Sequence, residues 1–258
     1  MCCGWCTPKR ECASRRRIRR ETPAPIRPGY RGEVHGDVGD SIGPGQWLPT
    51  DALLDELLGD DDPAAAAALA DSKRAGLPPI EVSAQSARLL YLLARISGAR
   101  RILEIGTLAG YSTIFLARGV GAEGSVVSLE HNPRHAEIAA DNLRRAGVAD
   151  RVEIIVGAAL DTLPGLRGDF DLVFIDADKE NNSAYLRWAI ALGRPGTVIV
   201  VDNVVRAGRI VAPAGDDHQA RGVRDMLEMM GTHPQLEAAA IQTVGAKGWD
   251  GLAIARVR

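Results

Sequence analysis

The feature that most constrains the fold is a regular alternation of short apolar runs with longer stretches of helical character. Five runs have the length and residue types of buried strands, at 101–106, 125–130, 151–157, 170–176 and 197–202. Such alternation is typical of a doubly wound parallel sheet with helices on both faces. Two further runs, 236–245 and 250–258, are joined by a short Gly-containing link, which predicts an antiparallel hairpin at the sheet edge. The sequence therefore predicts an α/β fold with a mostly parallel, seven-stranded sheet.

Two helices are expected before the first strand. Thr50 is a candidate N-cap for a helix over residues 50–59. In the stretch 82–96, helical spacing places four large apolar residues on one face: Leu89, Leu90, Leu93 and Ile96.

Composition limits the partners of this chain. With 258 residues, 46% of them hydrophobic, it can bury the core of one large domain. No apolar run reaches 18 residues, so no membrane span is expected. The formal net charge of −2 makes nucleic acid an unlikely ligand overall and leaves a small molecule as the expected partner.

The N-terminal segment has a different texture. Residues 1–45 are rich in Arg, Pro and Gly without apolar periodicity, so we expect a disordered tail ahead of a folded domain over 46–258. All four cysteines, Cys2, Cys3, Cys6 and Cys12, lie in this tail, which leaves the body free of disulfides and favours a reducing, cytoplasmic location. A zinc knuckle at the CxxC pair, an acid-binding segment and a transit peptide are the less favoured interpretations of the tail.

Polar side chains close two of the predicted strands. The run 170–176 ends in Asp176, followed by Lys179, and the run 197–202 ends in Asp202 and Asn203. Ligands of doubly wound sheets bind outside the carboxyl ends of the strands. These oxygen-bearing side chains are therefore expected to share one site.

The first strand ends in a glycine-containing turn that suits a ligand other than pyrophosphate. Gly106 and Gly110 allow a tight turn, but neither GxGxxG nor a GK[ST] motif is present. Glu104 places a carboxylate there, which favours a cationic ligand. Glu130, at the end of the second strand, has the position of a ribose-binding acid, although a solvated strand-end charge is an equal alternative.

Four segments together resemble one enzyme family: 102–117, 126–148, 170–186 and 194–211. They are similar to the cation-dependent S-adenosylmethionine O-methyltransferases, the group of caffeoyl-coenzyme A O-methyltransferase and, more distantly, catechol O-methyltransferase. The paired DxxK and DN motifs carry this resemblance, which covers about residues 50–258. It implies a Rossmann-like fold, a homodimer and transfer of a methyl group to a small hydroxylated aromatic acceptor.

The resemblance also implies which residues bind S-adenosylmethionine. In this family pattern the methionyl portion lies near Glu104, its carboxylate near Ser112, the ribose at Glu130 and the adenine beside Ala158, while the segment 80–83 covers the cofactor. The residues implied as cofactor contacts are Val82, Glu104, Gly106, Tyr111, Ser112, Glu130, Ala158 and Asp176.

A divalent cation is implied by the same resemblance. Its ligands would be Asp176, Asp202 and Asn203, and these hard oxygen donors suit magnesium, with manganese or calcium as alternatives. Lys179 matches the proposed general base of the catechol-acting relatives; a surface lysine paired with Glu180 or Asp178 is the alternative. The catalytic residues expected are thus Lys179 and Asp176.

Several features stay outside this pattern. Arg206 stands where the family commonly has an aromatic residue, and it is expected either to meet an anionic group of the acceptor or to face solvent. Asp178, Asn181 and Asn182 are expected to support the site or cap a helix, and His131, His218 and His233 to lie on the surface or cap helices. The rival functions are a nicotinamide-dependent reductase, a non-catalytic cofactor-binding protein and an RNA methyltransferase, which would need a more basic face.

Overall fold

The computed structural model describes residues 44–59 and 61–258, so the predictions for the tail up to residue 43 lie outside the described residues. The α-helices are α1 (Pro44–Leu58), α2 (Pro63–Arg74), α3 (Ala84–Ile96), α4 (Tyr111–Gly119), α5 (Pro133–Arg145), α6 (Ala159–Thr162), α7 (Asn182–Leu192) and α8 (His218–Thr232). The strands are β1 (Arg101–Ile105), β2 (Ser125–Glu130), β3 (Val152–Val156), β4 (Phe170–Ile175), β5 (Gly193–Asp202), β6 (Leu236–Gly245) and β7 (Gly248–Val257). Short 3₁₀ turns are η1 (Ala149–Arg151), η2 (Leu163–Gly165), η3 (Lys179–Asn181) and η4 (Arg206–Val211).

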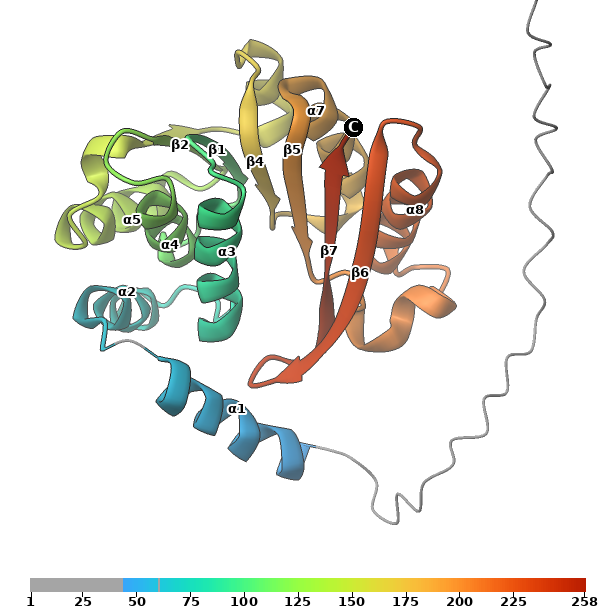
Figure 1. Ribbon diagram of the computed structural model, residues 1–258. Helices are drawn as coiled ribbons and strands as arrows, with labels where there is room; N and C mark the ends of the chain where they lie inside the picture. The colour runs from blue at the N-terminus through green and yellow to red at the C-terminus, as the bar shows by residue number, and fades with distance from the viewer. Residues whose placement is uncertain (1–43, 60) are drawn as a thin grey trace, which may run out of the picture. The chain divides into compact units, whose positions relative to one another are not determined.

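The strands form one seven-stranded sheet in the order β3-β2-β1-β4-β5-β7-β6. Strands β1 to β5 pair in parallel, and β7 pairs antiparallel with both β5 and β6, as the hairpin predicted (Figure 1). The predicted fold class is therefore confirmed. The strand order reverses between β1 and β4, so the crevice at their carboxyl ends is the expected ligand site.

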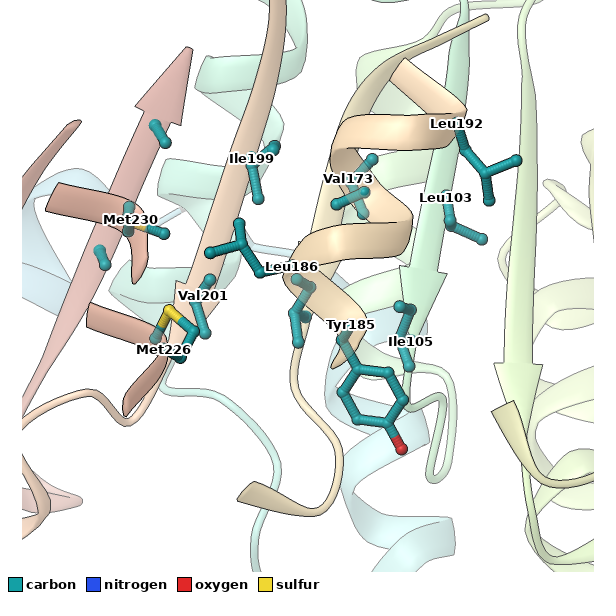
Figure 2. Close-up of a cluster of buried hydrophobic side chains, with 14 of the residues drawn as sticks. Leu103, Ile105, Val173, Tyr185, Leu186, Leu192, Ile199, Val201, Met226 and Met230 are labelled. Carbon is teal, nitrogen blue, oxygen red and sulfur yellow. The ribbon is translucent and has the colours of Figure 1, made fainter. Parts of the chain in front are cut away.

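Two hydrophobic cores cover the two faces of the sheet. In β1, Ile102 joins the core formed with α2 to α5, whereas Leu103 and Ile105 join the core formed with α7 and α8. This split follows from the strand period of two, which sends successive side chains to opposite faces. Figure 2 shows the second core, in which the ring of Tyr185 lies near Ile105.

The first helices differ from the sequence prediction. Helix α1 begins at Pro44 and not at Thr50, which lies inside the helix and is not its N-cap. In α3 the buried face consists of Ala87, Leu90 and Ala94, whereas Ile96 is 80% exposed. The predicted apolar face is thus wrong at its last residue, because α3 ends there and the chain turns away into the loop before β1.

No helix within residues 44–59 and 61–258 is both long enough and apolar enough to cross a lipid bilayer.

Candidate active site at the carboxyl ends of the strands

A cavity of about 760 Å³ opens at the carboxyl ends of the central strands. This volume lies within the range of small-molecule and cofactor sites. Nine of the residues predicted for the site line it: Val82, Gly106, Tyr111, Ser112, Glu130, Ala158, Asp176, Lys179 and Asn203. Residues predicted from the glycine-containing turn and residues predicted from the polar strand ends therefore line the same cavity. A second cavity of about 590 Å³, lined by Asp61 and Asp62 before α2 and by residues of α3 and α4, contains none of these residues.

The turn between β1 and α4 forms one wall of the cavity. Gly106 has φ +102°, and a Cβ atom there would lie 2.1 Å from the backbone oxygen of Asp176. Only glycine fits a backbone of this conformation at so close an approach. The turn therefore brings β1 and β4 together at the cavity, and α4 begins immediately after it at Tyr111.

Glu130 at the end of β2 holds this turn in place. Its Oε2 atom accepts hydrogen bonds from the backbone N–H groups of Thr107, at 3.2 Å, and Leu108, at 2.8 Å. Its Oε1 atom accepts from the N–H of Asn132 at 2.8 Å, and His135 Nδ1 lies 3.5 Å away. The carboxylate is buried and lines the cavity, so Glu130 is not the solvated strand-end charge that the sequence allowed as an alternative.

Glu104 lies behind the cavity wall and does not line it. Its carboxyl group is fully buried and accepts hydrogen bonds of 2.6 Å from the hydroxyls of Ser112, Thr113 and Ser128. Burial raises the pKa of Glu104 to about 7, and the charge of Asp176 adds to the rise, against the three hydroxyl groups, which lower it. Glu104 thus orients Ser112, which does face the cavity.

Asp176 and Lys179 line the opposite side of the cavity, whereas Asp202, at the end of β5, is buried and does not line it. Lys179 is buried, and its Nζ atom donates to Asp176 Oδ1 at 2.7 Å. Its partner is therefore Asp176, which excludes the alternative of a surface lysine paired with Glu180 or Asp178. Burial and, next, the charge of Asp176 raise the pKa of Asp202 to about 7. Asp202 Oδ1 accepts from the N–H of Asn203 at 2.7 Å.

The donor set of Asp176, Asp202 and Asn203 has the chemistry of a site for a hard cation. Two carboxylates that interact in a buried position repel each other, and a divalent cation between them relieves that repulsion. Asn203 adds an amide oxygen and has φ +58°, a strained conformation that is common at functional sites. Among the described residues no group of three or more His, Cys, Asp or Glu side chains could hold a metal ion; this set contains only two.

Several cavity residues were missed or misjudged in the sequence. Thr107, Leu108, His135, Tyr185 and Gln219 line the cavity, and no local motif marks them. His131 is exposed, as predicted, and also lines the cavity; His218 is exposed and His233 is the C-cap of α8, again as predicted. Arg206 lines the cavity too, although its sequence position left solvent as an alternative.

The residues expected to support the site have separate roles. Asp178 accepts hydrogen bonds from the hydroxyl of Tyr185 and from the side chain of Asn181. Asn181 is the N-cap of α7 but its side chain makes no capping hydrogen bond, and the fully buried amide of Asn182 has no hydrogen-bond partner among the described residues. Neither asparagine side chain therefore caps the helix.

Comparison with known proteins agrees with this geometry. Residues 64–257 match the sequence family described as O-methyltransferase. A catechol O-methyltransferase from Mycobacterium tuberculosis is 65% identical over 209 residues, which are 81% of this chain and 94% of that protein. The crystal structure of cofactor-bound Rv0187 from MTB superposes with a TM-score of 0.80 at 62% identity and covers 85% of this chain and 99% of that one.

A third similar protein is TomG, an O-methyltransferase from Streptomyces achromogenes involved in tomaymycin synthesis, whose structure contains S-adenosylmethionine. It is 44% identical, has a TM-score of 0.81 and covers 84% of this chain and 99% of that one. The chain belongs to this family of S-adenosylmethionine-dependent O-methyltransferases.

Proposed function

We propose that this enzyme transfers the methyl group of S-adenosylmethionine to a hydroxyl of a small catechol-like acceptor and that it needs a divalent cation. One observation carries the proposal: Asp176, Lys179 and Asn203 line the same cavity as Gly106 and Glu130. Donor-binding and hydroxyl-orienting groups therefore share one space, as a direct methyl transfer requires. The catechol O-methyltransferase name of the M. tuberculosis relative supports the acceptor class.

The donor half of the cavity has a partner for each portion of S-adenosylmethionine. Glu130 is the proposed acceptor for a ribose hydroxyl, because three backbone hydrogen bonds leave about one of the four lone-pair sites of its carboxylate unused. Ala158 borders the adenine, Ser112 meets the methionyl carboxylate, and Val82 covers the ligand from the segment before α3. Gly106 and Tyr111 shape the turn beneath it, with Glu104 in support of Ser112.

The cation would be held by Asp176, Asp202 and Asn203. Magnesium suits these oxygen donors, and manganese and calcium are alternatives. When bound, such a cation lowers the pKa of a coordinated hydroxyl and orients it.

The chain itself supplies Lys179 as the proton acceptor and holds the two reactants in line. In its neutral form Lys179 Nζ takes the proton of the acceptor hydroxyl, and the oxygen then bonds to the sulfonium methyl carbon. The sulfur–methyl bond breaks with its electron pair left on sulfur, which yields S-adenosylhomocysteine. Because Lys179 and Asp176 are hydrogen-bonded at 2.7 Å, the base is fixed beside the oxygen-binding groups. Alignment of the reactants then accounts for much of the rate.

The test is methyl transfer from labelled S-adenosylmethionine to vicinal dihydroxy aromatics, with magnesium or manganese and then with chelator. Asp202→Ala and chelator should each reduce transfer about 100-fold or more. Asp202→Ala should still bind S-adenosylmethionine in calorimetry, and Asp216→Ala, which changes an exposed aspartate, is the matched control. Transfer that persists with chelator would contradict the cation role. Cofactor binding without any transfer would favour the RNA-directed or non-catalytic alternatives.

We also propose a homodimer. Helix α1 exposes Leu53, Leu57 and Leu58, and β6 exposes Ile241 and Val244, which a second subunit could cover. Light scattering should give twice the mass of the chain, and Leu57→Asp should shift the protein toward monomer. A cytoplasmic location remains a prediction from the sequence.

A further inference from the structure

Arg206 is held in an unusual backbone conformation at the edge of the cavity. Arg206 and Ala207 have φ +56° and +53°, in the left-handed region that residues other than glycine rarely adopt. Asp250 Oδ1 fixes this turn by accepting hydrogen bonds of 3.0 Å from the N–H groups of Val205, Arg206 and Gly251. The strand β7 thus keeps Arg206 at the cavity against local backbone preference.

The guanidinium of Arg206 has unused hydrogen-bonding capacity. One Nη2–H donates to Gln219 Oε1, and the Nε atom is buried without a partner among the described residues. A buried donor without a partner is unfavourable, and the guanidinium has further N–H groups that can donate to a ligand oxygen.

Arg206 is also the cavity cation without a carboxylate partner. Of the two lysine or arginine side chains that line the cavity, Lys179 is bonded to Asp176, and no described carboxylate lies within 4.0 Å of Arg206. The charge of Arg206 acts on the neighbouring Asp217, but that carboxylate is bonded to Arg209 at 2.6 Å and caps α8.

We propose that Arg206, supported by Gln219, binds a carboxylate of the methyl acceptor and so selects dihydroxylated aromatic acids over neutral catechols. A planar guanidinium matches a carboxylate through parallel hydrogen bonds, and the pairing is stronger in a partly buried cavity than in water. Arg206 follows Asn203 by three residues, so the carboxylate site adjoins the proposed hydroxyl-orienting residues. This inference rests on the proposed O-methyl transfer and narrows its acceptor class.

A second source of the same chemistry is the carboxylate of S-adenosylmethionine itself, and the experiment separates the two. Wild type, Arg206→Met, Arg206→Lys and Arg187→Met are assayed with 3,4-dihydroxybenzoate and with its methyl ester, with magnesium present. Arg187→Met is the matched control because it removes an exposed arginine of α7 that lies outside the cavity lining.

Wild type should prefer the acid. Arg206→Met should lower kcat/KM for the acid about 10- to 100-fold, chiefly by raising KM. The same substitution should lower kcat/KM for the ester by less than about threefold. Arg206→Lys should fall between these values, and Arg187→Met should behave as wild type. The KM for S-adenosylmethionine should stay unchanged in all variants.

Three results would overturn the inference. Equal losses on acid and ester would mean that Arg206 only shapes the cavity, and a rise confined to the KM for S-adenosylmethionine would assign its carboxylate to Arg206. Absence of transfer to either acceptor by wild type would overturn the proposed function together with this inference, whereas the first two results leave the proposed function intact.

Discussion

The buried carboxyl group of Glu104 predicts a measurable dependence of stability on pH. This group is fully buried between β1 and α4, and burial raises its pKa from 4.5 to about 7 despite hydrogen bonds from three hydroxyls. The perturbation is Glu104→Gln, which keeps the size of the side chain and removes the charge. The hydroxyls of Ser112, Thr113 and Ser128 can rotate to meet the amide.

The sign follows from the direction of the shift. An acid whose pKa is higher in the folded protein binds its proton more tightly there, so folding stability is greatest at low pH and falls as the pH rises from the unfolded pKa to the folded pKa. Above about pH 7 the protein has lost all of the stability that protonated Glu104 provides at low pH. A shift from 4.5 to about 7 corresponds to about 3 kcal/mol. The difference in free energy of unfolding between Glu104→Gln and wild type should therefore shift by about 2–3 kcal/mol in favour of the variant between pH 5 and pH 8.5.

The assay is urea unfolding followed by circular dichroism at both pH values, without cofactor and with chelator. Glu153→Gln, which changes an exposed glutamate on β3, is the matched control and should show no pH-dependent difference from wild type. Other titrating groups cancel because each variant is compared with wild type at the same pH. If the difference between Glu104→Gln and wild type is the same at pH 5 and pH 8.5, Glu104 ionises normally and the reasoning is refuted.

Two further substitutions test the walls of the cavity. Lys247→Met removes bonds to Glu81, at 2.7 Å, and to the carbonyl of Pro79, at 3.2 Å, which hold the segment 79–82 beside the cavity. We expect the variant to bind S-adenosylmethionine about three- to tenfold more weakly in calorimetry, and unchanged affinity would contradict this role. Gly106→Ala adds a Cβ atom 2.1 Å from the backbone oxygen of Asp176, at a residue with φ +102°. We expect the free energy of unfolding in urea to fall by about 3 kcal/mol, and wild-type stability would contradict the packing described for this turn.

The sheet and the polar strand ends were predictable because their signals are local. Apolar runs indicate the strands, and because parallel strands end at one edge of the sheet, the sequence predicts that Asp176 and Asp202 lie close together, as they do. The hairpin followed from its short link. In each case a stretch of fewer than about a dozen residues carried the information.

The remaining features depend on contacts between distant parts of the chain. Asp250 fixes Arg206 from 44 positions away, and Lys247 bonds to Glu81 across 166 positions. No local pattern encodes such pairs. Likewise, the sequence showed that Glu104 stands at a strand end, but the pleat of β1 directs it toward α4 and away from the cavity.

The central claim is that Asp176, Asp202 and Asn203 hold a divalent cation, and manganese binding tests it most directly. Metal-free protein, saturated with S-adenosylhomocysteine, is titrated with manganese and the free ion is followed by electron paramagnetic resonance. The account predicts one tight site per chain in wild type and in Asp216→Ala, and its loss in Asp202→Ala. Equal manganese binding by wild type and Asp202→Ala would contradict the account.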